Sequence, residues 1–215
     1  GGILLIKTFQ YCSCSEPTLT VVIIPFKLVL QQPQNRAFCI LDFNISLFTI
    51  AATTGDGMKI AIISDTHNNL NNIQAVRQLI LAEGVKVIIH CGDLTEPDVL
   101  DYFGDFRLYV VYGNGDYGPD VSERLEWLGT ENQSDNNLVL DFDGKKIFVA
   151  HGHDVAGLNR AISSGLYDYV FHGHTHRCRG EKVGNSRVIN PGSLGGKKVG
   201  ARSFVILDLK NDKLK

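Results

Sequence analysis

Apolar runs alternate with amphipathic segments from residue 58 onward, and this alternation is the tightest constraint that the sequence places on the fold. The runs "KIAII" (59–63) and "VKVIIH" (85–90) are mostly apolar and rich in β-branched residues, as is typical of strands buried on both faces. The segment between them, 71–84, carries apolar side chains at helical spacing and closes on Gly84. Strand–helix–strand units of this kind predict a sheet with parallel strands.

The second half of the chain follows a different pattern. Residues 137–151 predict a hairpin around Asp143-Gly144, a dipeptide that tolerates the positive φ of a tight turn. A second hairpin is expected around Gly184-Asn185. The other predicted elements are helices at 97–103 and about 155–164, and strands at 107–112, 167–172 and 203–209. Parallel units followed by hairpins predict an α/β (α+β) protein with two sheets packed face to face and helices outside.

Residues 1–57 differ from the rest of the chain in composition. They carry six charged residues and three of the five cysteines, and their apolar runs have no clear period. The only methionine, Met58, stands immediately before the first patterned strand. We therefore expect residues 1–57 to be an N-terminal extension, non-native or poorly ordered, and 58–215 to be the domain. The alternative is a genuine N-terminal strand layer, since "TLTVVII" and "AFCILDF" could each form a strand.

Composition argues against several classes of function. The net charge of −2 predicts no basic surface for nucleic acid or anionic membranes. No apolar run reaches the roughly 20 residues that span a bilayer, so no membrane partner is expected. Five cysteines without C-x-x-C spacing argue against a disulfide framework and against a structural zinc site. This cysteine usage favours a reducing compartment, and we expect a cytoplasmic protein.

Similar polar motifs follow the ends of successive predicted strands. "SDTH" follows the first strand, "HCGD" the second, "GNGD" the third, "AHGHD" the hairpin and "GHTH" the strand after it. Because the carboxyl ends of neighbouring strands converge on one edge of such a sheet, we expect these motifs to meet there. A single Asp or His at a strand end more often has a capping or core role, but this set predicts a metal site. Its candidate ligands are Asp65, His67, Asp93, Asn114, His151, His174 and His176.

The chemistry of these side chains narrows the metal and the reaction. Oxygen and imidazole ligands without thiolate suit Mn²⁺, Fe, Ni²⁺, Zn²⁺ or Mg²⁺, and manganese is our first expectation. The set is too large for one tetrahedral ion and suits two ions that share a bridging carboxylate. Two ions about 3.5–4 Å apart would activate a bridging water and clamp both oxygens of a phosphoryl displacement. In the pairs Asp65/His67 and His174/His176, strand-like geometry would point both side chains to one side.

The motifs, in this order and spacing, resemble the calcineurin-like metallophosphoesterase superfamily. The later "INPGS" (189–193) resembles its small single-domain phosphodiesterase branch, of the YfcE type. The resemblance covers residues 58 to about 210 and none of 1–57. It implies a four-layer α-β-β-α sandwich of two mixed sheets with a dinuclear site. It also implies a metal-dependent phosphoric diester hydrolase in which a metal-bridging hydroxide attacks a small phosphodiester.

The resemblance further implies a role for each residue of the motifs. One metal would be held by Asp65, His67 and His176, the other by Asn114, His151 and His174, with Asp93 bridging the two. The catalytic set would comprise Asp93, Asn114 and His153, with His153 contacting the phosphate or supporting a ligand. His172, on the strand itself, is expected to be structural.

One position departs from the family pattern. Many members of the superfamily have a histidine after the motif asparagine, thought to protonate the leaving group, and some have cysteine, whereas this chain has Gly115. General acid catalysis is typically worth about 10²–10⁴-fold, so we expect a slow enzyme or one that prefers activated esters. Asp116 and His153 are the nearby side chains that could replace the missing acid.

The missing acid also leaves a second class of function open. The fold and the "NPGS" signature resemble the retromer subunit, a protein-binding scaffold with an impaired metal site. A scaffold predicts degraded ligands, whereas all of the motif ligands are intact here, so we favour the enzyme. The sequence leaves open the physiological substrate and the oligomeric state, and is compatible with a homo-oligomer.

Overall fold

The computed structural model of the chain describes residues 57–196 and 201–215. The predicted N-terminal extension and its alternative, the strand layer, lie outside the described residues. The domain boundary at Met58 therefore stays a prediction.

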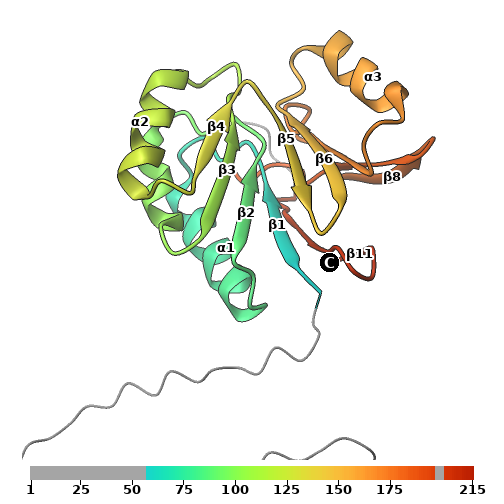
Figure 1. Cartoon of the computed structure of the whole chain (residues 1–215). Helices are drawn as coiled ribbons and strands as arrows, with labels where there is room; N and C mark the ends of the chain where they lie inside the picture. The colour runs from blue at the N-terminus through green and yellow to red at the C-terminus, as the bar shows by residue number, and fades with distance from the viewer. Residues whose placement is uncertain (1–56, 197–200) are drawn as a thin grey trace, which may run out of the picture. The chain divides into compact units, whose positions relative to one another are not determined.

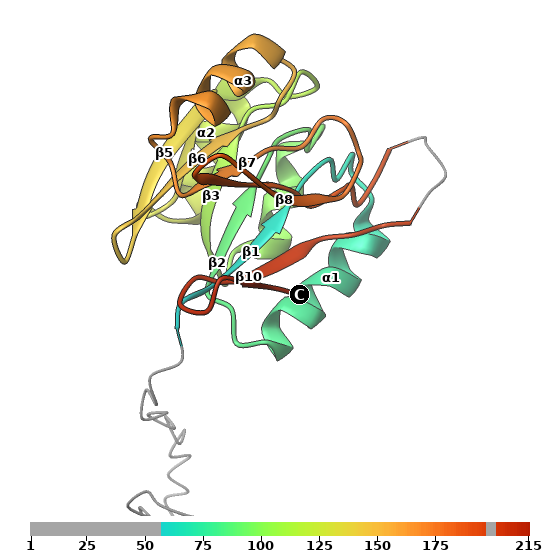
Figure 2. The same cartoon turned by 90° about the vertical axis from the view of Figure 1, so that its right-hand side faces the viewer.

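The first sheet has six strands in the order β11-β10-β1-β2-β3-β4. Its strands are β1 (Lys59–Ile63), β2 (Val87–His90), β3 (Arg107–Val111), β4 (Gln133–Asp135), β10 (Val205–Asp208) and β11 (Lys213–Leu214). Strands β1 to β4 run parallel, whereas β10 pairs antiparallel with β1, beside which Figure 2 shows it. The parallel order places the ends of β1, β2 and β3 on one edge, as the sequence predicts.

Three helices cover the outer face of this sheet: α1 (Leu70–Ala82), the 3₁₀ helix η1 (Pro97–Phe103) and α2 (Gly118–Leu128). Figure 1 shows α1 and α2 on the side of the sheet that faces away from β5 and β6. Helix α2 was not predicted from the sequence. Its signals are Pro119 in the first turn and Val121 and Leu125, which are buried one helical turn apart.

The second sheet has five strands in the order β5-β6-β7-β9-β8. Its strands are β5 (Asn137–Phe142), β6 (Lys145–Ala150), β7 (Tyr169–Phe171), β8 (Arg179–Val183) and β9 (Ser186–Asn190). Both predicted hairpins form, β5–β6 and β8–β9, and at the first turn Asp143 and Gly144 take φ of 53° and 76°. Strands β6, β7 and β9 run parallel, so the second half is mixed rather than built only of hairpins.

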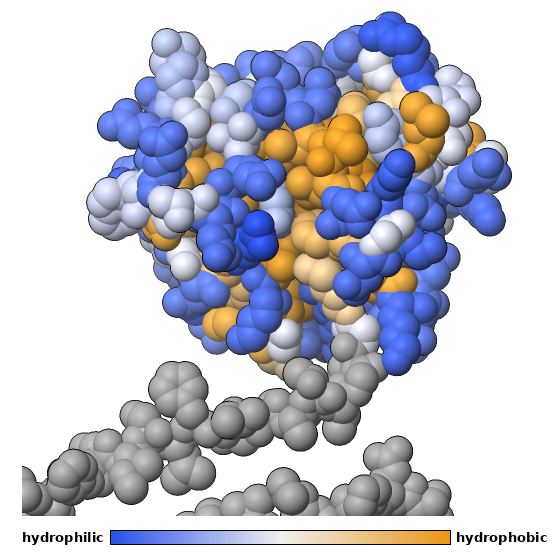
Figure 3. Space-filling model, viewed as in Figure 1, coloured by the Kyte–Doolittle hydropathy of each residue, from blue (hydrophilic) through white to orange (hydrophobic). Residues whose placement is uncertain are grey.

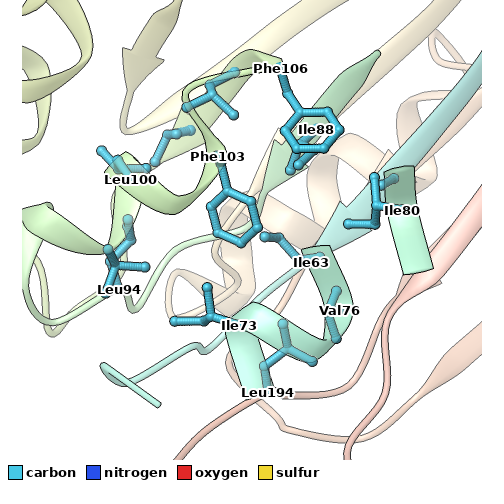
Figure 4. Packing of buried hydrophobic residues seen from close by; sticks show 14 of the residues in the cluster. Ile63, Ile73, Val76, Ile80, Ile88, Leu94, Leu100, Phe103, Phe106 and Leu194 are labelled. Atoms are coloured by element: carbon cyan, nitrogen blue, oxygen red, sulfur yellow. The ribbon is translucent and has the colours of Figure 1, made fainter. Parts of the chain in front are cut away.

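Three apolar clusters of the described residues pack the layers of the fold against one another. One joins the outer helices to the first sheet, where Ile73, Ile80 and Phe103 pack on Ile63 and Ile88 (Figure 4). The second lies between the two sheets; it includes Ile60, Ile62, Ile89, Val149, Phe171 and Ile189. The third packs α3 (Val155–Ser164) on the second sheet. These clusters confirm the predicted α-β-β-α sandwich of two mixed sheets.

Several element boundaries differ from those expected. Residues 97–103 form a 3₁₀ helix, and the strands expected at 85–90 and 167–172 begin two residues later. The short strands β4 and β11 were not predicted, because three and two residues carry no readable period. Across the described ranges, no helix combines the length and the apolar character needed to cross a membrane.

Candidate metal centre

The loops that follow β1, β2, β3, β6 and β7 carry all of the candidate ligands, and the structure brings these loops together. Asp65 and His67 lie on the loop after β1, Asp93 on the loop after β2 and Asn114 on the loop after β3. The second sheet contributes His151 after β6, and His174 and His176 after β7. Backbone hydrogen bonds join these loops: Asp65 N donates to Gly92 O, and Gly173 N donates to His151 O.

Most of the candidate ligands have left-handed backbone conformations. The φ values are 51° at Asp65, 41° at His67, 59° at Asp93, 65° at His174 and 58° at His176. The expected strand-like geometry of the Asp65/His67 and His174/His176 pairs is therefore wrong. These residues lie past the strand ends, where the chain turns sharply, and the turns rather than a β-pleat aim the side chains into the centre.

One group of donors comprises Asp65, His67, Asp93 and His176, which offer one ligand atom each within 4.8 Å of one another. His176 Nε2 lies 3.0 Å from Asp65 Oδ1 and 3.4 Å from His67 Nε2, and His67 Nε2 lies 3.7 Å from Asp93 Oδ2. Ligands about 2.1 Å from a common ion are roughly 3.0–3.4 Å apart in octahedral or tetrahedral geometry. The distances from His176 Nε2 fall in this range, whereas those from His67 Nε2 to Asp93 Oδ2 and Asp65 Oδ1, 3.7 Å and 4.0 Å, are longer. The group is compact enough for its members to become co-ligands of one cation after small side-chain shifts.

A second group adjoins the first through Asp93. His151 Nε2 lies 3.5 Å from Asp93 Oδ1 and 3.3 Å from His174 Nδ1. His151 Nδ1 lies 2.7 Å from Cys91 O, and since a carbonyl only accepts, this nitrogen carries a proton while Nε2 faces Asp93 and His174. Asn114 is exposed and lines the same cavity as Asp93 and His174.

Asp93 is the residue common to both groups. Its Oδ2 faces His67 and its Oδ1 faces His151, while Gly115 N donates to Oδ1 over 2.8 Å. Burial by itself would raise the pKa of Asp93, but hydrogen bonds with His151 and Gly115 and the nearby imidazoles lower it well below its usual range. Asp93 is therefore an anion placed between two sets of imidazole nitrogens.

Asp65 gives an independent test of whether the site fits a cation. Its side chain is fully buried, and burial raises its pKa. Oδ2 accepts from Ser64 Oγ at 2.5 Å and from His174 N at 3.1 Å. Oδ1 has no hydrogen-bond partner among the described residues. A buried carboxylate oxygen without a donor is costly, and a divalent cation between Asp65 and the histidines would compensate its charge.

Comparison with known proteins identifies the family. The sequence model of the calcineurin-like phosphoesterase superfamily domain matches residues 58–212. The chain belongs to this superfamily. Its centre is hereafter called the phosphoesterase centre.

Two relatives are similar in sequence to this chain over most of their own length. Phosphodiesterase MJ0936 of Methanocaldococcus jannaschii is 39% identical over 70% of this chain and 93% of its own length. The probable metallophosphoesterase YsnB of Bacillus subtilis is 30% identical over 72% of this chain and 86% of its own length.

Solved structures show the same fold. The structure of an archaeal phosphodiesterase has a TM-score of 0.70 and 37% identity, covering 74% of this chain and 98% of that protein. The Escherichia coli phosphoesterase YfcE has a TM-score of 0.55 at 20% identity, covering 73% of this chain and 96% of its own. Vps29 of Entamoeba histolytica has a TM-score of 0.57 at 21% identity, covering 71% and 86%. The last two likenesses concern the fold alone.

Asp116 accepts backbone hydrogen bonds from two loops of the phosphoesterase centre. Its Oδ1 accepts from the backbone N–H groups of Leu94 and Thr95, and its Oδ2 from those of Asp93 and Gly113. These bonds are 2.8–3.0 Å long and tie the loop after β2 to the loop after β3. Both oxygens are thus engaged as acceptors, so the expectation that Asp116 could replace the missing acid is not supported by its contacts.

The other residues around the expected acid occupy distinct places. Gly115 contributes only its backbone N–H to Asp93. His153 is exposed, with its ring centre 5.5 Å from that of His151 and 6.4 Å from that of His174. His172 is buried, and its Nδ1 contacts Gly173 O and Asn190 Nδ2, a placement that suits the structural role expected for it. Of these residues, only His153 has a side chain that a substrate could reach.

Residues that were not predicted from the sequence hold the phosphoesterase centre from behind. Ser64 binds Asp65 directly. Leu194 N donates to Ser64 O and Gly195 N to Asp65 O, so the loop after β9 buttresses the loop after β1. Gly196 lies so close to His67 and His176 that a Cβ there would stand 2.9 Å from the His176 ring. The sequence signal for this loop is the pair Gly195-Gly196, because glycine permits close backbone approach.

A cavity of about 850 Å³ opens in front of the phosphoesterase centre. Its lining includes His67, Asp93, Asn114, His174 and His176 from the centre itself. The rest of the lining, within the part of the chain that the structure describes, is uncharged: Asn68, Asn69, Leu70, Asn71, Thr95 and Gly196. The cavity thus combines the candidate ligands with neutral, amide-rich side chains.

Proposed function

We propose that this protein is a dinuclear metal-dependent phosphodiesterase. The observation that carries the proposal is the position of Asp93, whose two carboxylate oxygens face different groups of imidazole donors. Such a carboxylate suits the bridge of a two-cation site. The 39% identity to Phosphodiesterase MJ0936 supports the same class of substrate.

The residues would divide between two cations as the family resemblance implies. Asp65, His67 and His176 would hold one, Asn114, His151 and His174 the other, and Asp93 would touch both. When bound, two ions would neutralise charge on a phosphoryl group and lower the pKa of a water so that it could attack as hydroxide. Manganese remains our first expectation among the ions that oxygen and imidazole donors suit.

The chain's own groups orient this chemistry. Ser64 and His174 N hold Asp65 through one oxygen, which leaves the other directed at the histidines. The hydrogen bond from His151 Nδ1 to Cys91 O fixes the ring so that Nε2 points to Asp93. The neutral side chains of Asn68 to Asn71 suit a diester, which carries one negative charge rather than the two of a monoester dianion.

The site has no dedicated acid, among the described residues, that would protonate the leaving group. Gly115 has no side chain, and Asp116 is engaged by backbone donors. We assign His153 the role of contacting the phosphate or supporting a ligand, because it is exposed beside His151 and His174. Without a dedicated acid, the enzyme should favour esters whose leaving groups are already good.

The direct test is turnover by the full-length chain. Bis(p-nitrophenyl) phosphate and p-nitrophenyl phosphate are compared with Mn²⁺, Ni²⁺, Zn²⁺ and Mg²⁺ in turn. We expect metal-dependent cleavage of the diester with little cleavage of the monoester. No diester cleavage with any metal, although two ions bind, would contradict the proposal and favour the alternative, a protein-binding scaffold.

Replacing Asp93 by Asn tests the shared carboxylate. The amide lacks the charge and one of the two anionic oxygens, so we expect turnover to fall at least 10²-fold and fewer metal ions to bind. The matched control is Asp143→Asn at the tip of the β5–β6 hairpin, where Asn also tolerates the positive φ of 53°. Unchanged turnover in Asp93→Asn with both ions bound would contradict the assignment of Asp93 as the shared carboxylate.

The cytoplasmic location and the homo-oligomer stay predictions of the sequence. Of the cysteines in the described residues, Cys91 is buried and Cys178 exposed, and both are free thiols. This is compatible with a reducing compartment.

A further inference from the structure

A second hollow lies beside the phosphoesterase centre, between α3 and the outer face of the β5–β6 hairpin. We call it the α3 groove; its volume is about 520 Å³. Its walls include Phe148 and Ala150 from β6, Leu158 and Ala161 from α3, and Tyr167 just before β7. Figure 3 shows apolar surface gathered over the β5–β6 hairpin, next to α3.

The surface of the α3 groove suits a flat apolar group. Phe148 and Tyr167 stand with ring centres 5.2 Å apart and planes tilted by 34°. Both rings are half-buried, and Leu166, which also lines the groove, is 68% exposed. Aromatic rings gain from contact with another ring beyond the area that they bury. The charged residues of the lining, Asp154 and Arg160, lie 3.9 Å apart as an ion pair with each other.

The α3 groove is continuous with the phosphoesterase centre. His151, Gly152 and His153 line it, and His151 Nε2 lies 3.5 Å from the shared carboxylate of Asp93. Among the described residues, the larger cavity shares no lining residue with the groove and is lined instead by His67 and His176. Two hollows of different lining therefore adjoin the centre: the cavity carries amide side chains, and the α3 groove carries two aromatic rings beside polar residues. A phosphodiester has an ester group on each side of its phosphorus.

We propose that the α3 groove binds an aromatic ester group of the phosphodiester substrate. The proposal rests on the proposed function and adds a substrate class to it: diesters that carry at least one aryl or heteroaryl ester group. The phosphoryl group lies at the candidate ligands, and the ring lies against Phe148, Tyr167 and Leu158. The second ester group lies in the amide-rich cavity.

The test measures ligand binding rather than turnover. Phenylphosphonate and methylphosphonate share the phosphoryl head and differ in the ring. Their affinities for the full-length, Mn²⁺-loaded chain are measured by titration calorimetry at one pH. Burying one ring face should make the phenyl compound roughly tenfold tighter than the methyl compound.

Two serine variants separate the groove from the rest of α3. Ser164 lines the groove, whereas Ser163 does not, and both are exposed and bond a backbone carbonyl of the same helix. Ser164→Trp places an indole in the groove, and Ser163→Trp adds the same bulk outside it. We expect the preference for the phenyl compound to disappear in Ser164→Trp, to persist in Ser163→Trp, and methylphosphonate binding to stay within twofold in both.

Each outcome of this comparison has one meaning. Equal affinities of the wild-type chain for both phosphonates would overturn the proposal, as would a phenyl preference that survives in Ser164→Trp. Loss of the preference in both variants would show a general effect of α3 and would also count against the groove. Turnover of bis(p-nitrophenyl) phosphate is followed in parallel. If the chain shows no turnover but still binds phenylphosphonate more tightly than methylphosphonate, the result contradicts the proposed phosphodiesterase function and leaves binding of an aromatic group in the α3 groove supported.

Discussion

At the scale of single residues, the phosphoesterase centre is built from backbone conformations that most side chains avoid. Asp65, His67, Asp93, His174 and His176 all have positive φ. Left-handed backbone costs an L-residue about 1 kcal/mol or more, and Asp, Asn and His tolerate it better than most. The surrounding hydrogen bonds hold these conformations in place. The residue types suited to binding a cation are thus also suited to the turns that carry them.

Replacing Asp116 should show most clearly how these hydrogen bonds stabilise the loops of the centre. In Asp116→Asn, one acceptor oxygen becomes an NH₂ group that faces backbone N–H donors. We expect a loss of about 1–3 kcal/mol in the free energy of unfolding, with weaker Mn²⁺ binding. Urea unfolding and metal titration measure the two effects, with Asp143→Asn as the control. Full stability and unchanged metal affinity would show that Asp116 does not position the loops.

At the scale of elements, close contact between strand ends sets the size of the centre. Gly173, at the end of β7, lies against the end of β1, where a Cβ would stand 1.8 Å from Ser64 Oγ and 2.7 Å from Asp65 Oδ2. The two sheets can bring Asp65 and His174 together only because no side chain separates them at this point.

Gly173→Ala should therefore separate the two sheet edges. The added methyl group must displace Ser64 and Asp65, so we expect a loss of roughly 1–3 kcal/mol in stability and a fall in Mn²⁺ affinity of at least tenfold. The control is Gly104→Ala after η1, where φ is −60° and a Cβ would lie 3.4 Å from Leu128. Thermal unfolding measures the stability of the two variants, and metal titration measures their Mn²⁺ affinity. Equal values for Gly173→Ala and Gly104→Ala would contradict the packing argument.

At the scale of the whole molecule, the buried side chains of His90 and His172 make the fold sensitive to acid. His90 is buried at the end of β2; its Nδ1 accepts from Gly92 N, and its Nε2 contacts Thr66 Oγ1. Burial lowers the pKa of His90 to about 4, and burial also lowers the pKa of His172. In the unfolded chain both should titrate near the ordinary value of about 6.5.

The sign of the resulting pH dependence follows by linkage. Between about pH 6.5 and pH 4, the unfolded chain binds a proton at His90 that the folded chain does not. The free energy of unfolding should therefore fall as the pH falls through this window, by up to about 3 kcal/mol for His90. Urea unfolding of the metal-free protein at several pH values, compared with His90→Gln, measures this contribution. An equally steep fall in the variant would rule out His90 as its source.

The amount that could be predicted differs between local and long-range features. The buried strands, α1, both hairpins and the sandwich follow from periodicity and turn residues, which act over a few neighbours. Helix α2 was missed although Val121 and Leu125 stand at helical spacing. The meeting of Asp65, Asp93, His151 and His176 could be expected because parallel strands end on a common edge. Whether these residues bind metal stays a prediction.

The sequence by itself determined which side chains leave the strand ends and that they are of metal-binding type. Only the tertiary structure decided how they are aimed, because the left-handed turns at Asp65 and His174 depend on contacts between loops far apart in the chain. It also decided that Asp116 accepts hydrogen bonds from backbone N–H groups and that α3 borders a groove with two aromatic rings beside His151. Local propensity is a property of neighbouring residues, whereas a cavity and a shared carboxylate arise only when distant segments pack.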